Sequence, residues 1–277
     1  MSNIDNKIYI IPYKGELFQE RRKSYFLKAF GEEVRDMRIF PFGKCNYFCP
    51  YCKRTGYDKK NSVIVGSVEV ESEKIFHAIS ESIKKGEIVR LSGGDPCTYP
   101  ELSKRMLQYV KELGGNGSMA HNASAPDFIK DLTENCLLNS ISIDFKAENA
   151  EKLSKIAGIS EKSAISMWDK TLKTIEVLKF AKGVKVDIRT CVFNDTSFDE
   201  LLNIGKIIQK HANDRFFWTL RIYSIVDSFS KKTKRPEEMK KLAQCISKQI
   251  PNLRMGIRLK WENGAFFYFM NGEELNI

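Results

Sequence analysis

Two hydrophobic periods alternate along most of this chain. Short runs rich in β-branched and aromatic residues predict strands, and they are separated by segments whose apolar residues recur every three or four positions, as in helices. A further run, at 116–120, is interpreted as a strand from its position between two helical patterns. The predicted strands are 37–42, 88–92, 116–120, 140–145, 184–192 and 216–224.

Six helical patterns lie between and after these strands. Four show an apolar stripe on one face, and two open with a proline in the first turn, where its missing N–H costs nothing. They run through 75–83, 102–113, 168–178 and 201–208, and they begin at Pro126 and Pro236. Repeated strand–helix units with short links predict an α/β fold with a parallel sheet, either curled into a barrel or open and doubly wound.

The two ends of the chain differ from this pattern. An apolar run at 8–13 and a mixed helical pattern over 17–30 predict an N-terminal extension over residues 1–36. Two strand-like runs, 253–259 and 265–270, flank Asn263-Gly264 and predict a β-hairpin. We expect residues 37–225 to form the core, and a helix and hairpin in 226–277 to complete the same domain.

Composition narrows the class of protein. The 277 residues include 42% hydrophobic residues but no run of about 18 apolar ones, and the charged N-terminus has no apolar signal segment. Seven cysteines with one tight cluster are typical of a reducing cytosol, so we expect a cytoplasmic protein. The net charge of +10 is spread widely apart from the basic run 231–235, which predicts an exposed loop, with contact to RNA or another acidic partner as the alternative.

Three cysteines follow the first core strand with the spacing C-x3-C-x2-C. Cys45, Cys49 and Cys52 lie within eight residues. Thiolates favour iron–sulfur clusters or zinc, and both usually take four ligands. If no distant fourth ligand joins, one metal keeps an open coordination position at which chemistry can occur.

Polar groups also follow or end the later strands. Gly93-Gly94-Asp95-Pro96 follows the second strand, His121-Asn122 the third, and Asp144-Phe145-Lys146 ends the fourth, while Arg189 lies in the fifth. Because chemistry gathers at the carboxyl ends of parallel strands, these groups predict a site there. The glycine pair permits a close backbone approach to a ligand, and the adjacent carboxylate can bind an ammonium group.

Several of these groups have structural alternatives. The glycine pair is also compatible with a simple tight turn, and Asp144 and Lys146, which point to the same face, with a salt bridge lining the fold. Arg189 could bind a carboxylate bidentately or pair with a surface acid. His121 is interpreted as a polar loop residue. The other single histidines and cysteines are interpreted as structural: His77, His211, Cys97, Cys136, Cys191 and Cys245.

Taken together, the cysteine loop and the glycine turn resemble the motifs of radical S-adenosylmethionine (SAM) enzymes. Cys45, Cys49, Tyr51 and Cys52 match the family pattern C-x3-C-x-aromatic-C, and Gly93-Gly94-Asp95-Pro96 resembles its Gly-Gly-Glu-Pro motif with Asp in place of Glu. The resemblance covers residues 37–225. It implies a partial (β/α)6 barrel of the radical SAM type, here with an N-terminal extension and a C-terminal β-hairpin.

The resemblance also implies cofactors and their ligands. The three cysteines would bind three irons of a [4Fe-4S] cluster, and the fourth iron would bind the amino and carboxylate groups of SAM. Gly93, Gly94 and Asp95 would bind the ammonium end of SAM, and Tyr51 would pack at its adenine through the main chain. Reductive cleavage would give methionine and a 5′-deoxyadenosyl radical that abstracts a substrate hydrogen. An external one-electron donor of the flavodoxin or ferredoxin type would be required.

Within this superfamily, the chain is most similar to small activases of glycyl-radical enzymes. Asn122 matches their Thr-Asn-Gly segment, Asp144 and Lys146 their Asp-x-Lys, which helps bind the SAM carboxylate, and Arg189 their strand-borne arginine. The Asp-Gly-Pro-Gly entry to the cluster loop is missing, and no ferredoxin-like cysteine insert follows Cys52.

Three functions therefore remain open. The first is a radical SAM enzyme acting on a protein glycine as an activase. The second is radical SAM modification of RNA, a peptide or a small metabolite, with the positive charge favouring RNA mildly. The third is a non-catalytic zinc- or nucleic-acid-binding protein, whose fourth zinc ligand would be His77, His121 or Cys97; the Gly-Gly-Asp-Pro turn has no purpose in that case. Candidates for substrate contact by position alone are Arg221, Tyr223, Trp261 and 231–235.

Overall fold

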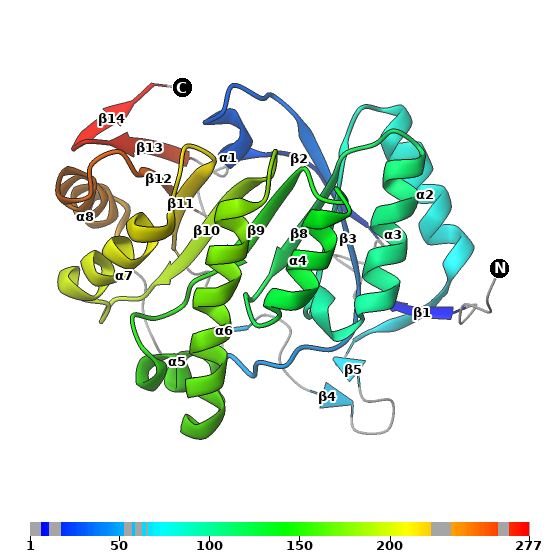
Figure 1. Cartoon of the computed structure of the whole chain (residues 1–277), viewed down its shortest axis with the longest axis horizontal. Coiled ribbons are helices and arrows are strands. Elements are labelled where there is room, and N and C mark those ends of the chain that lie inside the picture. Colours follow the sequence, from blue (N-terminus) through cyan, green and yellow to red (C-terminus); the bar gives the residue numbers. More distant parts are fainter. Residues whose placement is uncertain are drawn as a thin grey trace. The chain divides into compact units, whose positions relative to one another are not determined.

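The structure is a computed structural model, drawn in Figure 1. The chain divides into two compact units. Unit 1 comprises Met1–Asn46, Arg54–His121 and Asp127–Ile141, and unit 2 comprises Tyr47–Lys53, Asn122–Pro126 and Ser142–Ile277. The structure describes residues 7–10, 18–52, 57–58, 63–64, 66–222, 234–259 and 266–276.

Unit 1 is built on four strands in the order β2-β3-β7-β8. β3, β7 and β8 are parallel, and β2 joins the edge antiparallel. Val89 and Leu91 of β7 are fully buried, as expected for the centre of a parallel sheet. The strands are β2 (Phe18–Lys23), β3 (Arg35–Phe42), β7 (Ile88–Gly93) and β8 (Gly117–His121), with two small antiparallel pairs beside them: β1 (Lys7–Ile10) with β6 (Val68–Glu71), and β4 (Tyr57–Asp58) with β5 (Val63–Ile64).

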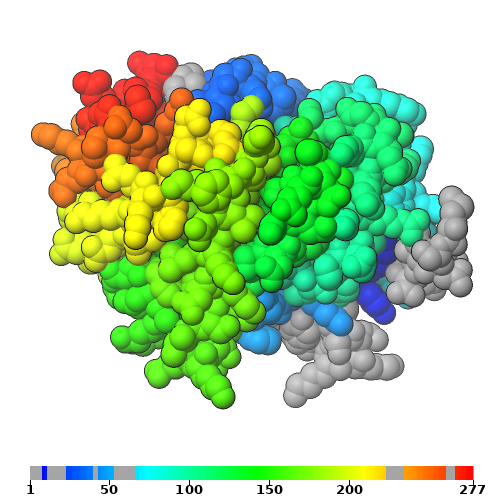
Figure 2. Space-filling model, in the orientation of Figure 1, coloured from blue at the N-terminus to red at the C-terminus, as the bar shows by residue number. Residues whose placement is uncertain are grey.

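The helices of unit 1 bury the apolar stripes that predict them. Ile75 and Ile79 of α2 and Met106 and Val110 of α3 have no exposed surface. α3 and α4 lie in front of the unit 1 strands in Figure 1, and their side chains form a continuous cover there in Figure 2. The helices are α1 (Tyr25–Lys28), α2 (Ser72–Lys84), the 3-10 turn η1 (Pro96–Thr98), α3 (Pro100–Glu112) and α4 (Pro126–Glu134).

Unit 2 continues with strands in the order β9-β10-β11-β12-β13-β14. β10, β11 and β12 are parallel, while β13 and β14 are antiparallel additions. The strands are β9 (Ser140–Asp144), whose first two residues belong to unit 1, β10 (Lys185–Val192), β11 (Phe216–Ile222), β12 (Arg254–Arg258), β13 (Phe266–Met270) and β14 (Glu273–Leu275). The helices are α5 (Ala150–Ala157), α6 (Glu161–Phe180), α7 (Phe198–His211) and α8 (Pro236–Gln249).

The two faces of the unit 2 strands differ in character. Ile188 of β10 and Trp218 of β11 are buried on the apolar face, which α6 and α7 cover (Figure 1). Trp168 of α6 contacts Phe145 edge-on, with ring centroids 5.2 Å apart. Gly205 of α7 lies so close to Trp218 that a Cβ there would be 2.8 Å from its ring. Since side chains alternate along a strand, the opposite face carries the polar residues of the functional site.

The sequence predicted this architecture well except at the chain's ends. The α/β class with mostly parallel strands is confirmed, and so is the antiparallel pairing of the C-terminal hairpin, whose Asn263-Gly264 turn lies outside the described residues. The helical prediction for 17–30 is wrong, because residues 18–23 pair with β3 as strand β2 and leave one helical turn, α1. Helix α5 and strand β14 were not predicted.

The predicted division into 1–36, 37–225 and 226–277 remains a prediction. None of the helices that the structure describes combines the length and apolarity needed to cross a bilayer.

Candidate active site

The cysteine loop leaves the end of β3 and carries three cysteines, none of which forms a disulfide in the described part of the chain. Cys45, Cys49 and Cys52 are each partly exposed. The N–H of Cys52 donates to the carbonyl of Cys49 at 2.9 Å, so these two thiols share one tight turn. Within unit 2, the N–H of Phe48 donates to the carbonyl of Ala157 at 2.8 Å and fixes the loop to the end of α5. Burial raises the pKa of the Cys49 thiol.

Gly158 also constrains the cysteine loop. It ends α5 in the left-handed conformation at φ 64°, where residues with a side chain are strained. A Cβ at this position would overlap the carbonyl oxygen of Phe48. Only glycine therefore permits this approach of α5 to the residue before Cys49.

Gly158→Ala is accordingly expected to displace the loop and weaken cluster binding. The free energy of unfolding should fall by about 1–3 kcal/mol, because a left-handed alanine and a backbone clash both cost energy. The measurement is iron per chain after anaerobic reconstitution, together with urea unfolding. Gly183→Ala is the control, since Gly183 is also left-handed, at φ 73°, but has nothing near its missing Cβ. Equal iron loss in both variants would contradict the proposed role of Gly158.

The Gly93-Gly94-Asp95-Pro96 segment is fixed to the residue before Cys45. Gly93 ends β7 at φ 141°, a backbone conformation that side chains rarely allow. The N–H of Asp95 donates to the carbonyl of Lys44 at 2.7 Å, and the Thr98 hydroxyl lies 3.2 Å from the same carbonyl. The Asp95 carboxylate caps η1 by accepting from the N–H of Cys97 at 2.9 Å. Within unit 1, the glycine turn is thus bonded to the start of the cysteine loop.

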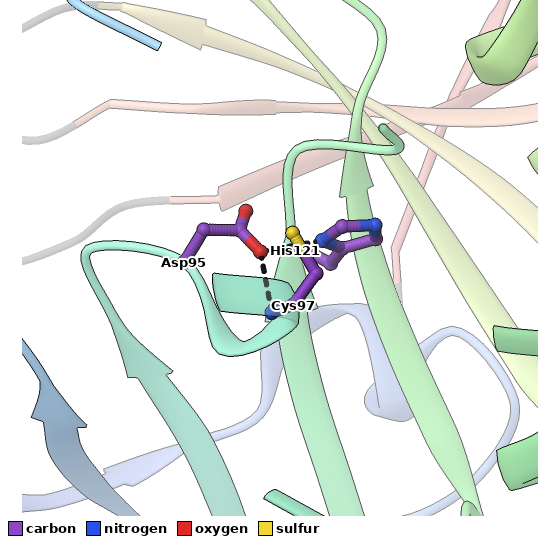
Figure 3. Close-up of side chains that lie close together, drawn as sticks. All are labelled: Asp95, Cys97 and His121. Carbon is purple, nitrogen blue, oxygen red and sulfur yellow. Dashed lines mark hydrogen bonds and ion pairs between the residues drawn. The ribbon is translucent and has the colours of Figure 1, made fainter. Parts of the chain in front are cut away.

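His121 is a buried part of the site, and its interpretation as a polar loop residue is wrong. It is the last residue of β8, and its Nδ1 lies 2.7 Å from Asp95 Oδ1 (Figure 3). The two side chains are 0% and 3% exposed. Burial alone would raise the pKa of Asp95, but the charge and hydrogen bond of His121 and the bonds from Cys97 lower it below its usual value.

Asp95, Cys97 and His121 are the one group of three or more His, Cys, Asp or Glu residues in the described part of the chain whose potential ligand atoms already lie close together. Their ligand atoms lie within 4.8 Å of one another. However, two ligands of one tetrahedral zinc ion are about 3.3 Å apart, given bond lengths of about 2.0–2.1 Å. The 2.7 Å between Asp95 and His121 is the length of a hydrogen bond and does not fit a shared ion. The trio therefore gives no support to the zinc alternative.

Unit 2 brings together the charged residues predicted at its strand ends. Lys146 Nζ lies 2.8 Å from Asp144 Oδ2, and Arg189 lies 2.9 Å from Asp144 Oδ1. Lys146 also lies 3.3 Å from the hydroxyl of Tyr51, whose ring is buried against Phe193. Burial would raise the pKa of Asp144, but the charges of Lys146 and Arg189 outweigh it and hold that pKa well below its ordinary value.

These contacts decide between the alternatives left open by the sequence for the Asp144–Lys146 pair and for Arg189. Asp144 and Lys146 do form an ion pair, and the partner of Arg189 is that same carboxylate rather than a separate surface acid. Asn122 is buried and accepts from the N–H of Ser124 at 3.1 Å. Tyr223, Trp261 and 231–233 lie outside the described residues.

Cys191 and Arg221 lie close to this charged cluster, which the sequence interpretation did not predict. Cys191 is interpreted above as structural and Arg221 is a candidate by position alone, yet they are paired residues of β10 and β11. The signal that could have found them is the alternation of Asp187, Arg189 and Cys191 with apolar residues, which places all three on one face.

A family model described as the Radical SAM superfamily matches residues 39–208. This match covers more than half of the chain, which therefore belongs to the radical SAM superfamily. Members of this superfamily are enzymes that use a [4Fe-4S] cluster and SAM, and they generally require an electron donor.

Two relatives differ in how much of their length this chain matches. GTP 3′,8-cyclase of Clostridium perfringens is 27% identical over 192 residues, which are 68% of this chain and 56% of the cyclase. The chain therefore spans little more than half of that relative. A Methanocaldococcus jannaschii protein, provisionally named a glycyl-radical enzyme activating enzyme, is 24% identical over 235 residues, 82% of this chain and 90% of that protein.

Solved radical SAM structures share the fold. TYW1 with a lysine-pyruvate adduct bound has a TM-score of 0.63 at 19% identity, covering 91% of this chain and 85% of that one. Streptococcus suis SuiB has a TM-score of 0.62 at 15% identity, covering 86% and 53%. The partial-barrel architecture expected from the motifs is consistent with these neighbours.

The residues present fit a [4Fe-4S] cluster. The donor set is three cysteine thiols on one short loop, with Cys49 and Cys52 on a shared turn. Three soft ligands match three irons and leave one iron for a further ligand. Gly158, which admits no side chain beside this loop, is consistent with a loop that must keep one conformation.

Proposed function

We propose that this chain is a single-cluster radical SAM enzyme in which Cys45, Cys49 and Cys52 bind the cluster. The observation that carries the proposal is the set of three partly exposed cysteines on one short loop, which backbone hydrogen bonds hold at Lys44 and at Phe48. When bound and reduced, the cluster and SAM supply a 5′-deoxyadenosyl radical that abstracts hydrogen from a substrate. The chain's own part is to hold SAM, orient the substrate and keep other reactants away.

The family motifs identify the residues that are proposed to contact SAM. In unit 1, Gly93 and Gly94 offer backbone that a ligand can approach closely, and Asp95 offers a carboxylate for the SAM ammonium. His121 orients Asp95, which is one methylene shorter than the glutamate of the family motif, by the 2.7 Å hydrogen bond.

In unit 2, Lys146 and Arg189 are proposed to bind the SAM carboxylate, and Asp144 holds both cations in place through its two oxygens. Asn122 and the main chain of Tyr51 are proposed to contact the remainder of SAM. The Tyr51 side chain has a separate task, since its buried ring and hydroxyl fix the position of Lys146.

For the substrate, we propose a protein glycine, which would make the chain an activase. The support is the relative provisionally named an activating enzyme, which this chain matches over 90% of that relative's length. A small anionic metabolite is the second candidate. It is favoured by the similarity to GTP 3′,8-cyclases and by Arg189 and Arg221, which lie on the polar face of β10 and β11.

Anaerobic reconstitution tests the chemistry. The loaded protein should hold about four irons and four sulfides per chain and, with dithionite and SAM, release 5′-deoxyadenosine and methionine. Zinc without iron, or a loaded protein that releases neither product, would refute the radical SAM assignment of these cysteines.

The substrate is tested separately. Adding a candidate glycyl-radical enzyme should produce a glycyl-radical signal in electron paramagnetic resonance, whereas added GTP should stay unchanged by mass spectrometry. GTP consumption with no glycyl radical would replace the activase proposal by the second candidate.

A further inference from the structure

The polar face of the unit 2 strands extends beyond the residues proposed to bind SAM. Asp187, Arg189 and Cys191 share a face of β10, and Thr219 and Arg221 share the matching face of β11. The strands are in register with Arg189 beside Thr219 and Cys191 beside Arg221. This face is turned away from the one that α6 and α7 cover, so its charges need partners from within the face or from a ligand.

Each carboxylate oxygen on this face already has a partner within the face. Asp187 accepts from the hydroxyl of Ser142 at 2.8 Å and from that of Thr219 at 2.5 Å. Asp144 binds Lys146 with one oxygen and Arg189 with the other. Neither acid therefore has an oxygen directed to a third cation in these contacts.

Two arginines on this face keep unused donors. Arg189 Nε is buried and has no hydrogen-bond partner in the described part of the chain. Among the same described residues, the Arg221 guanidinium forms no ion pair or hydrogen bond. Burial alone would lower its pKa, but Cys191, Asp144 and Asp187 are near enough to raise it above its usual value. A buried guanidinium donor without a partner costs free energy unless a ligand completes it.

We propose that Arg221 binds an oxyanion group of the substrate, a carboxylate or a phosphate, beside the SAM-binding residues. The assignment of this oxyanion to a substrate rests on the proposed function. Guanidinium matches the planar fork of a carboxylate or phosphate with two parallel hydrogen bonds, which gives orientation as well as affinity. Arg221 is only partly buried, so a ligand can reach it. It is paired with Cys191, one pleat further along the strands than the Arg189–Thr219 pair, so a group bound there would lie beside the charged cluster.

Binding of simple anions to the cluster-loaded protein tests this inference. The probes are inorganic phosphate, acetate, and an acidic peptide containing glycine, titrated at constant ionic strength with thermal unfolding as the measurement. At least one probe should raise the Tm of the wild type. Arg221→Gln should weaken its binding by about tenfold to a hundredfold, since a hydrogen bond to a charged group contributes about 1.5–3 kcal/mol. Arg221→Lys should retain part of the binding.

Two controls distinguish binding at Arg221 from a general effect of positive charge and from binding at the SAM site. Arg254→Gln removes the same charge from the neighbouring strand β12, where Arg254 donates to the carbonyl of Asp214, and should leave probe binding unchanged. SAM affinity, measured on the same samples by equilibrium dialysis, should stay within about twofold of wild type in Arg221→Gln. No response of the wild type to any probe, or equal losses in both variants, overturns the inference.

Loss of SAM affinity in Arg221→Gln would likewise overturn it, because Arg221 would then belong to the SAM site. The probe that binds identifies the source of the oxyanion: phosphate favours a phosphorylated metabolite, acetate a carboxylate metabolite, and the peptide an acidic segment of a protein. Anion binding at Arg221 in a protein that releases no 5′-deoxyadenosine would refute the proposed function while leaving the site established.

Discussion

Cys49→Ala is expected to abolish both the cluster and the cleavage of SAM. Cys49 and Cys52 share one turn, and each thiolate is proposed to bind one iron, so loss of Cys49 leaves two ligands where three are needed. Iron per chain after anaerobic reconstitution should fall close to zero, the brown absorbance should disappear, and 5′-deoxyadenosine should fall below detection. Iron and sulfide assays, absorbance and liquid chromatography give these three readouts.

Cys245→Ala is the matched control for this change. Cys245 is an exposed free thiol of α8, far in sequence from the loop, and the same substitution there should leave iron and product at wild-type levels. A Cys49→Ala protein that still holds about four irons and cleaves SAM would show that the cluster ligands lie elsewhere.

The motifs could be predicted because they are local. Three cysteines on one loop and a glycine turn after a buried strand are defined by spacing alone, and the strands between them follow from period and β-branched content. The same holds for Asp144 and Lys146, since two residues of one strand separated by one must face the same way.

The pairing between elements could not be predicted from the sequence. His121 looks like a loop residue because the run at 116–120 is not rich in β-branched residues, and only the packing of β8 beside β7 brings its ring to Asp95. The role of Gly158 is hidden for the same reason, because Phe48 is 110 positions away in the chain. The N-terminal strand β2 is set by pairing with β3, which overrides its local helical pattern.

The contacts of Asp144 lead to the second large effect, on stability. Asp144→Asn removes the only negative charge that is bonded to both Lys146 and Arg189 in the described structure. The side chains of Lys146 and Arg189 are only 7% and 13% exposed, respectively. Breaking a buried pair leaves an uncompensated charge and costs about 3–5 kcal/mol. We expect the free energy of unfolding, measured with urea at pH 7, to fall by about that amount. Asp131→Asn, which breaks the more exposed pair with Lys104, should cost no more than about 1 kcal/mol.

The pH dependence of this difference distinguishes lost charge from lost packing. The pKa of Asp144 is lower in the folded chain than its value of about 3.9 when unfolded, because Lys146 and Arg189 stabilise the carboxylate. Its charge therefore contributes full stability above pH about 4, and that contribution is lost as the pH falls toward the lowered folded pKa. The gap between wild type and Asp144→Asn should be constant from pH 6 to 8 and should narrow below about pH 4. A gap that stays unchanged down to about pH 3 would mean that Asp144 stabilises unit 2 through shape and hydrogen bonding rather than through its charge.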